Sequence, residues 1–117
     1  MFKGFKKKFV KVKKGKIFCR VGGKGPPLLL LHGYPQTHIM WHKTANELSK
    51  SFTIIAADLR GYGSSLVLKS DNKHINYSKR EMAKDMVQMM DKLGFKKFFI
   101  AGHDRGGRVA HRLARDY

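Results

Sequence analysis

The sequence predicts an α/β fold in which a mostly parallel sheet is covered by helices on both faces. Three short segments are apolar at consecutive positions, which is typical of strands buried within a parallel sheet: 28–31, 52–57 and 98–101. Segments with helical spacing of apolar residues separate them, so strands and helices alternate along the chain. An alternation of apolar and charged residues before the first buried strand predicts a β-hairpin over residues 9–21.

The elements that follow the hairpin are indicated by breakers and by helical periodicity. Three glycines and two prolines predict a loop over residues 22–27. A first helix is expected at 41–48, where Trp41, Ala45 and Leu48 recur on one side. We therefore interpret Trp41 as part of the core rather than as a substrate contact.

The second helix is predicted from its caps and from a stripe of methionines. Ser78 can cap its start with Glu81 as capping-box partner, and Gly94 suits the position just after its end. Its apolar residues recur at helical spacing: Met82, Met86, Met89, Met90 and Leu93. We interpret this stripe as core packing rather than a metal site, because a helix that covers a sheet needs such a face. A third helix is expected at 109–117.

The chain is strongly basic, with 25 Lys and Arg against 8 Asp and Glu and a formal net charge of +17. A nucleic-acid-binding module is the non-enzymatic alternative that this charge raises. However, the lysines crowd residues 3–16 and the nearby phenylalanines do not repeat like a base-stacking platform. We therefore expect a solvated lysine surface and a small-molecule partner, with neither nucleic acid nor membrane as partner and with a homodimer left open.

The single cysteine and the histidines indicate neither a disulfide nor a metal site. Cys19 has no partner for an internal disulfide and is expected to pack as a small hydrophobe. The spacing of five histidines does not match a metal-binding helix face: His32, His38, His42, His103 and His111. No signal peptide is recognised, and the longest apolar run, 28–31, is too short to span a bilayer. A cytoplasmic protein without cofactor or metal is expected.

Three loops rich in glycine and polar residues leave the carboxyl ends of the predicted strands: 32–35, 58–65 and 102–107. Binding and catalytic groups gather at this edge of α/β sheets. The last loop reads Gly-His-Asp-Arg-Gly-Gly, and its glycines permit a strand to turn at once into a helix. Asp104 would project from that turn beside the positive end of the helix. An aspartate there is anionic at neutral pH and can displace a leaving group from an sp³ carbon, after which water and a general base must cleave the ester.

Together these three motifs resemble the α/β-hydrolase superfamily, and most closely its haloacetate (fluoroacetate) dehalogenases, with epoxide hydrolases and haloalkane dehalogenases as cousins. The resemblance covers nearly the whole chain. It implies Asp104 as the nucleophile and an oxyanion hole made by the backbone N–H groups of Tyr34 and Arg105. It also implies that Arg105 and Arg108, one helical turn apart, bind the substrate carboxylate. The alternative is that both are surface arginines, since Arg112 and Arg115 make the same helix basic.

The resemblance also implies that residues 1–117 form the N-terminal part of one α/β-hydrolase domain. The catalytic histidine, its acidic partner and the cap of the family lie downstream of the helix that follows the turn at 102–107, which is called the nucleophile elbow in this family. We therefore expect this chain to support the first half-reaction at most, and its last strand to leave an unpaired apolar sheet edge. The activity expected of the full-length parent is hydrolysis of a small 2-haloacid. An epoxide hydrolase, another α/β-hydrolase and an inactive fragment remain as alternatives.

Overall fold

The computed structural model describes residues 4–13, 15–32, 37–59, 65, 79–103 and 105–116. Strands and helices alternate after an initial hairpin, in the order that the sequence predicts. The elements are β1 Lys6–Val12, β2 Gly15–Gly23, β3 Pro27–Leu31, the 3₁₀ helix η1 His38–Trp41, α1 His42–Leu48, β4 Thr53–Ala57, α2 Lys79–Lys92, β5 Phe99–Gly102 and α3 Arg105–Asp116.

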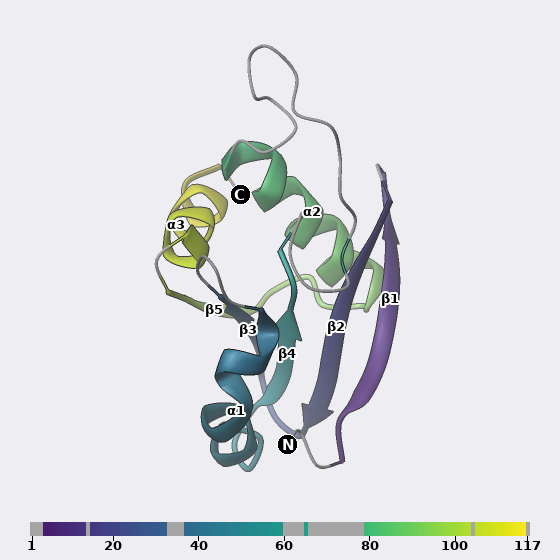
Figure 1. Ribbon diagram of the computed structural model, residues 1–117, viewed down its shortest axis with the longest axis vertical. Helices are drawn as coiled ribbons and strands as arrows, with labels where there is room; N and C mark the ends of the chain where they lie inside the picture. The colour runs from purple at the N-terminus through teal and green to yellow at the C-terminus, as the bar shows by residue number, and fades with distance from the viewer. Residues whose placement is uncertain are drawn as a thin grey trace.

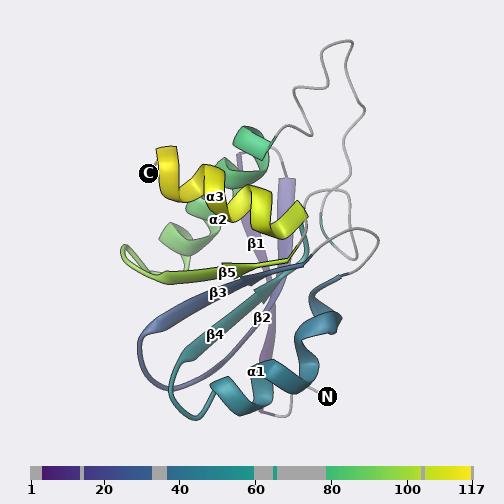
Figure 2. The same ribbon diagram turned by 90° about the vertical axis from the view of Figure 1, so that its left-hand side faces the viewer.

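The strands form a single sheet in the order β1-β2-β4-β3-β5. β3 is parallel to both of its neighbours, whereas β2 is antiparallel to both β1 and β4. Helices α2 and α3 cover one face of the sheet and α1 covers the other (Figures 1 and 2). The α/β fold class is therefore confirmed, with a parallel centre and an antiparallel hairpin at one end.

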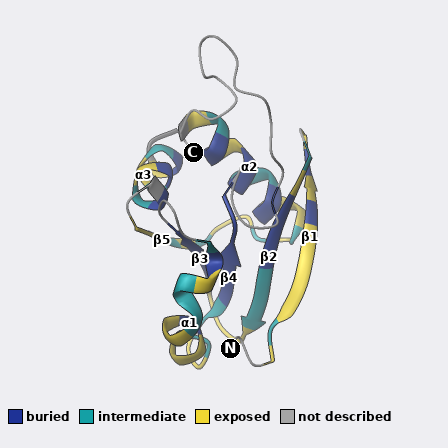
Figure 3. Cartoon of the chain, in the orientation of Figure 1, coloured by how far each residue is buried: buried dark blue, intermediate teal, exposed yellow. Residues whose placement is uncertain are grey.

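The predicted strands β3 and β4 are buried because each supplies side chains to two cores (Figure 3). The prediction of a third buried strand is wrong for β5, whose residues are half-buried or exposed because it is the terminal strand of the described sheet. Leu29 and Leu31 of β3 join the core beneath α2 and α3, whereas Leu28 and Leu30 join the smaller core beneath α1. The four methionines of α2 pack into the first core as predicted, and each is at most 1% exposed: Met82, Met86, Met89 and Met90. Trp41 packs against the second core, as expected.

Several boundaries differ from the predicted ones. β1 begins at Lys6, because strand pairing with β2 extends beyond the alternating pattern. β2 runs through Gly22 and Gly23, which the sequence places in a loop, because these residues pair with β4. The third helix begins at Arg105 rather than at 109, since the turn before it is very short. Gly94 has φ +93° and ends α2 as predicted, whereas Ser78 lies outside the described residues.

β5 is the terminal strand of the described sheet and pairs with β3 on one side. Phe99, in this strand, is 60% exposed. Phe99 thus exposes an apolar side chain at this end of the described sheet.

Candidate active site

The carboxyl ends of three parallel strands meet at one edge of the sheet. Leu31 at the end of β3 is in register with Ala57 of β4 on one side and Gly102 of β5 on the other. The residues that follow these strands, His32, Asp58 and His103, therefore leave the sheet side by side. This is the edge at which the sequence predicts the site.

The connection from β5 to α3 is a turn with almost no room for side chains. A Cβ atom at Gly102 would lie 2.3 Å from the carbonyl oxygen of Gly106, and one at Gly106 would lie 2.3 Å from that of Leu31. Within the turn, Gly106 N donates to His103 O at 2.9 Å, and His103 N donates to Leu31 O at 3.0 Å, which ties the start of the turn to the end of β3. These contacts explain why glycine stands at positions 102 and 106, and they agree with the tight strand-to-helix turn that the sequence predicts.

The structure describes only some of the predicted site residues. Asp104 and Tyr34 lie outside the described residues. Arg105 opens α3, where its backbone is described but its side chain is not. Arg108 lies one turn further along α3 and is exposed. The assignments of nucleophile, oxyanion hole and carboxylate clamp therefore stay predictions.

Asp58, directly after β4, is the centre of a buried hydrogen-bond network. One of its carboxylate oxygens, Oδ1, accepts from the backbone N–H of His38 and lies against the Nδ1 of the same residue, both at 2.7 Å. Its backbone carbonyl accepts from the Ser65 hydroxyl at 2.6 Å, and its N–H donates to Phe18 O at 2.9 Å. The Ser65 hydroxyl oxygen also accepts from Phe18 N at 2.9 Å. The end of β4 is thereby tied to β2, to η1 and to residue 65.

His32 links the ends of β3 and β4. Its Nε2 accepts from the backbone N–H of Leu59 at 2.9 Å, and its side chain is fully buried. An acceptor nitrogen carries no proton, so His32 is the neutral Nδ1–H tautomer. This hydrogen bond gives His32 a structural role, because it joins the residues that follow β3 and β4. Among the residues that the structure describes, no three His, Cys, Asp or Glu side chains gather as a metal site would require.

Sequence reasoning saw His38 only as one of several histidines, and Asp58 and Ser65 only as the two ends of a loop motif. Neither His38 nor Ser65 stands in a periodic pattern, and their partners are distant in sequence. The burial of His38, Asp58 and Ser65, at 4%, 1% and 6% exposure, is the signal that reveals them. A buried polar group needs a partner, so such a cluster marks a place where the fold is rigidly held.

Cys19 is buried in the first core, as expected. Burial raises the pKa of its thiol to about 12. Two smaller influences act in opposite directions: the charge of Lys8 lowers this pKa and the charge of Asp58 raises it. The thiol is therefore protonated at neutral pH and cannot serve as a nucleophile.

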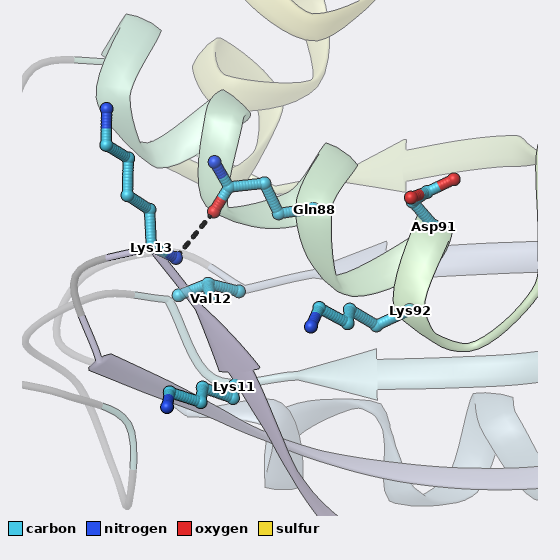
Figure 4. A pocket seen from close by; sticks show the side chains of 6 residues that line it. All are labelled: Lys11, Val12, Lys13, Gln88, Asp91 and Lys92. Carbon is cyan, nitrogen blue, oxygen red and sulfur yellow. Dashed lines mark hydrogen bonds between the residues drawn. The ribbon is translucent and has the colours of Figure 1, made fainter.

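A surface hollow of about 380 Å³ lies between the end of β1 and α2 (Figure 4). Three lysines and one aspartate contribute to its lining: Lys11, Val12, Lys13, Gln88, Asp91 and Lys92. The backbone N–H of Lys13 donates to Gln88 Oε1 at 2.8 Å, while the side chains of Lys11 and Lys13 extend away from each other. The hollow takes no residue from the carboxyl ends of β3, β4 or β5 and offers no convergent polar groups, so it is not the candidate site.

A model of the alpha/beta hydrolase fold family matches residues 26–117, and the chain belongs to this family. Fluoroacetate dehalogenase from Burkholderia sp is 50% identical over the whole chain, which covers 38% of that relative. Soluble epoxide hydrolase from Corynebacterium sp. (strain C12) is 42% identical over 80% of the chain and is covered over 31% of its length. The chain thus spans about a third of the length of these relatives.

Solved structures agree with this assignment. ALR0039 from Nostoc sp PCC 7120, described as an alpha/beta hydrolase, is 56% identical with a TM-score of 0.97; the match covers 99% of this chain and 40% of that one. Epoxide hydrolase VrEH1 from Vigna radiata is 29% identical with a TM-score of 0.89, over 98% of this chain and 37% of that one. In the described parts of the chain, no helix has the length and apolar character needed to cross a membrane.

Proposed function

We propose that this chain carries the nucleophile of a hydrolase that removes halide from a small 2-haloacid such as haloacetate. The observation that carries the proposal is the turn between β5 and α3, in which the contacts of Gly102 and Gly106 leave room only for glycine. Asp104 stands in this turn, directly before the first residue of α3. The 50% identity with a fluoroacetate dehalogenase supports a haloacid as the substrate.

In the proposed first step, a carboxylate oxygen of Asp104 forms a bond to the carbon that carries the halogen. The carbon–halogen bond breaks, and the halide leaves with the bonding electrons, which produces an aspartyl ester. Arg105 and Arg108 would hold the substrate carboxylate, because a guanidinium group binds a carboxylate through two parallel hydrogen bonds. The exposed position of Arg108 on α3 leaves its guanidinium group accessible to a solute.

In the proposed second step, water attacks the ester carbonyl of Asp104 and passes a proton to a general base. The oxyanion that forms would accept hydrogen bonds from the backbone N–H groups of Tyr34 and Arg105. Collapse of this state releases the hydroxyacid and restores the carboxylate. We place this base outside residues 1–117, because the resemblance to the family implies a catalytic histidine downstream of α3. His32 and His38 are both engaged in buried hydrogen bonds.

The test is to incubate the chain with chloroacetate and to locate the adduct by peptide mass spectrometry. A carboxymethyl ester on Asp104 is expected, and hydroxylamine should cleave it, releasing glycolate and leaving a hydroxamate. Asp104→Asn should form no such adduct, whereas Asp91→Asn, at an exposed position on α2, is the matched control that should. A hydroxylamine-resistant adduct would instead indicate alkylation of a sulfur or nitrogen atom, and the protonated Cys19 thiol disfavours a thioether.

Epoxide hydrolysis is the second candidate, and it is favoured by the 42% identity with a soluble epoxide hydrolase. It would use the same nucleophile on a neutral substrate, with no need for an arginine pair. The same assay with styrene oxide in place of chloroacetate distinguishes the two. An adduct on Asp104 from the epoxide together with none from chloroacetate would favour this second candidate.

A further inference from the structure

The pairing of β1 with β2 brings aromatic and cationic side chains together on one face of the hairpin. Val10 and Val12 of β1 point into the core beneath α2 and α3, and successive side chains of a strand point to opposite faces. Lys7, Phe9 and Lys11 therefore form a row on the other face. The residues directly opposite them on β2 share that face: Arg20, Phe18 and Lys16.

Phe9 presents its ring to solvent at the centre of this face, where it is 58% exposed. The ring is supported from within. The buried Phe18 ring lies 4.9 Å from it, centroid to centroid, and lies 5.1 Å from the imidazole of His38. Both ring nitrogens of His38 have hydrogen-bond partners, Arg20 and Asp58. Phe9 is thus an exposed aromatic ring on a rigid support, which is a pre-ordered surface for stacking.

The exposed side chains around Phe9 are cationic. Lys7 and Lys11 lie two residues, or about 6.8 Å, before and after it along β1. Lys16 lies opposite Lys11, and all three lysines are exposed (Figure 3). Residues 1–46 contain no Asp or Glu, so no acidic residue of the hairpin offsets these charges. An exposed ring between lysines fits a polyanion that carries flat apolar groups.

A single-stranded nucleic acid has both features, because its phosphates are anionic and its unpaired bases can stack on an aromatic ring. In a duplex the faces of the bases are covered by neighbouring base pairs, so Phe9 would have nothing to stack on. An anionic membrane needs a larger apolar surface that inserts into the lipid. Of the two rows, which the structure describes in full, Phe9 is the only exposed apolar side chain.

We propose that this face of the hairpin binds a single-stranded nucleic acid without sequence preference: one base stacks on Phe9, and the neighbouring phosphates bind Lys7, Lys11 and Lys16. The sequence predicts neither a stacking platform nor a nucleic-acid partner, because its phenylalanines do not repeat along the chain. Strand pairing, rather than a repeat, provides the supported ring. Phe9 and the three lysines lie outside the candidate active site, so this binding is independent of the proposed hydrolysis.

The ring is tested by binding of a short fluorescein-labelled oligodeoxythymidylate to the full chain, measured by fluorescence anisotropy at low salt. Phe9→Leu keeps an apolar side chain without a ring and should weaken binding about tenfold, whereas Phe9→Tyr should stay within about twofold of the wild type. Phe99→Leu is the matched control, because Phe99 is 60% exposed at the opposite end of the described sheet. It should leave binding unchanged. Equal binding by the two leucine variants would overturn the proposal.

The lysines are tested by the salt dependence of the same binding. For single strands, the slope of log K against log salt becomes shallower by about 0.7 for each phosphate contact that is lost. Changing both Lys7 and Lys11 to Gln should therefore make the slope shallower by about 1.4. The matched control changes the exposed Lys92 and Lys97 to Gln, which removes the same net charge and should preserve the slope. Equal slopes in the two double variants would show that net charge alone attracts the strand, and would overturn the proposal.

Competitors test the kind of partner. An oligouridylate should compete within about twofold of oligodeoxythymidylate, because both offer phosphates and base faces, whereas a duplex of the same length should compete at least about fivefold less well. Equal competition by the duplex would overturn the proposal. Vesicles that contain phosphatidylserine should bind equally to the wild type and to Phe9→Leu. A loss of vesicle binding in Phe9→Leu together with unchanged oligonucleotide binding would favour a membrane instead and would also overturn it.

Discussion

The hairpin at one end of the sheet and the carboxyl edge of its central strands are built on opposite principles. The hairpin β1–β2 belongs to a stretch of 46 residues without a single Asp or Glu, and the lysines of β1 are exposed. At the carboxyl ends of β3 and β4, by contrast, the polar groups are buried and hydrogen-bonded: His32, His38, Asp58 and Ser65. The difference teaches that the net charge of +17 does not locate the candidate site. The site is located by close backbone contacts and by buried polar groups whose partners are fixed.

The largest effect is expected at the β5–α3 turn, from Gly106→Ala. The new methyl group would lie 2.3 Å from Leu31 O and 2.4 Å from His32 O, and these backbone atoms belong to or directly follow a central strand. We expect a loss of about 3 kcal/mol or more in the free energy of unfolding, measured by urea denaturation. Gly107→Ala is the matched control, because its Cβ would meet nothing closer than 3.5 Å, and it should gain about 0.5–1 kcal/mol of helix propensity. Equal losses in the two variants would contradict the close-packed turn.

The next effect is expected at the buried network, from Asp58→Leu. This change removes the acceptor for both N–H groups of His38 and leaves them buried without it. The expected loss is about 2–3 kcal/mol in the free energy of unfolding. Asp58→Asn retains a carbonyl oxygen at this place and should lose less, so indistinguishable urea midpoints for the two variants would argue against hydrogen bonding as the cause.

Cys19 gives a pH-dependent prediction. Its thiol pKa is raised by burial from 9.0 to about 12, so the folded state binds this proton more tightly than the unfolded state does. The resulting stability is fully present below pH 9 and is lost as the pH rises from 9 towards 12. The free energy of unfolding should therefore fall more steeply with pH in this window for the wild type than for Cys19→Ala. The difference in slope is at most about 1.4 kcal/mol per pH unit. Parallel curves would show that the thiol is not perturbed.

The smallest effect is expected on the lysine surface, from Lys11→Gln. Lys11 is exposed on β1, and substitutions at such sites usually change the free energy of unfolding by less than about 0.5 kcal/mol. A larger change in the free energy of unfolding would contradict the interpretation of these lysines as a solvated surface. Urea denaturation at low and high salt measures this directly.

Local patterns were sufficient to predict most of the fold. The apolar runs of β3, β4 and β5, the methionine stripe of α2 and the stop at Gly94 each depend on neighbours in sequence, and all are found in the structure. The extension of β2 through Gly22 and Gly23 was missed, because pairing with β4 overrides the preference of glycine for loops.

The candidate site was predicted less completely, for the same reason. The turn at Gly102 to Gly107 has a local signature, and its contacts agree with it. The Arg20–His38–Asp58 network joins residues 18 and 20 positions apart, and a single histidine in a sequence does not reveal which groups will surround it. Only the packing of β2, β4 and η1 brings these three side chains together.

The most direct test of the central claim is the mass of the peptide that contains residue 104 after incubation with chloroacetate. The account predicts one carboxymethyl ester, located on Asp104, labile to hydroxylamine and absent in Asp104→Asn. An unmodified peptide, or an adduct that persists in Asp104→Asn, would contradict the assignment of Asp104 as the nucleophile.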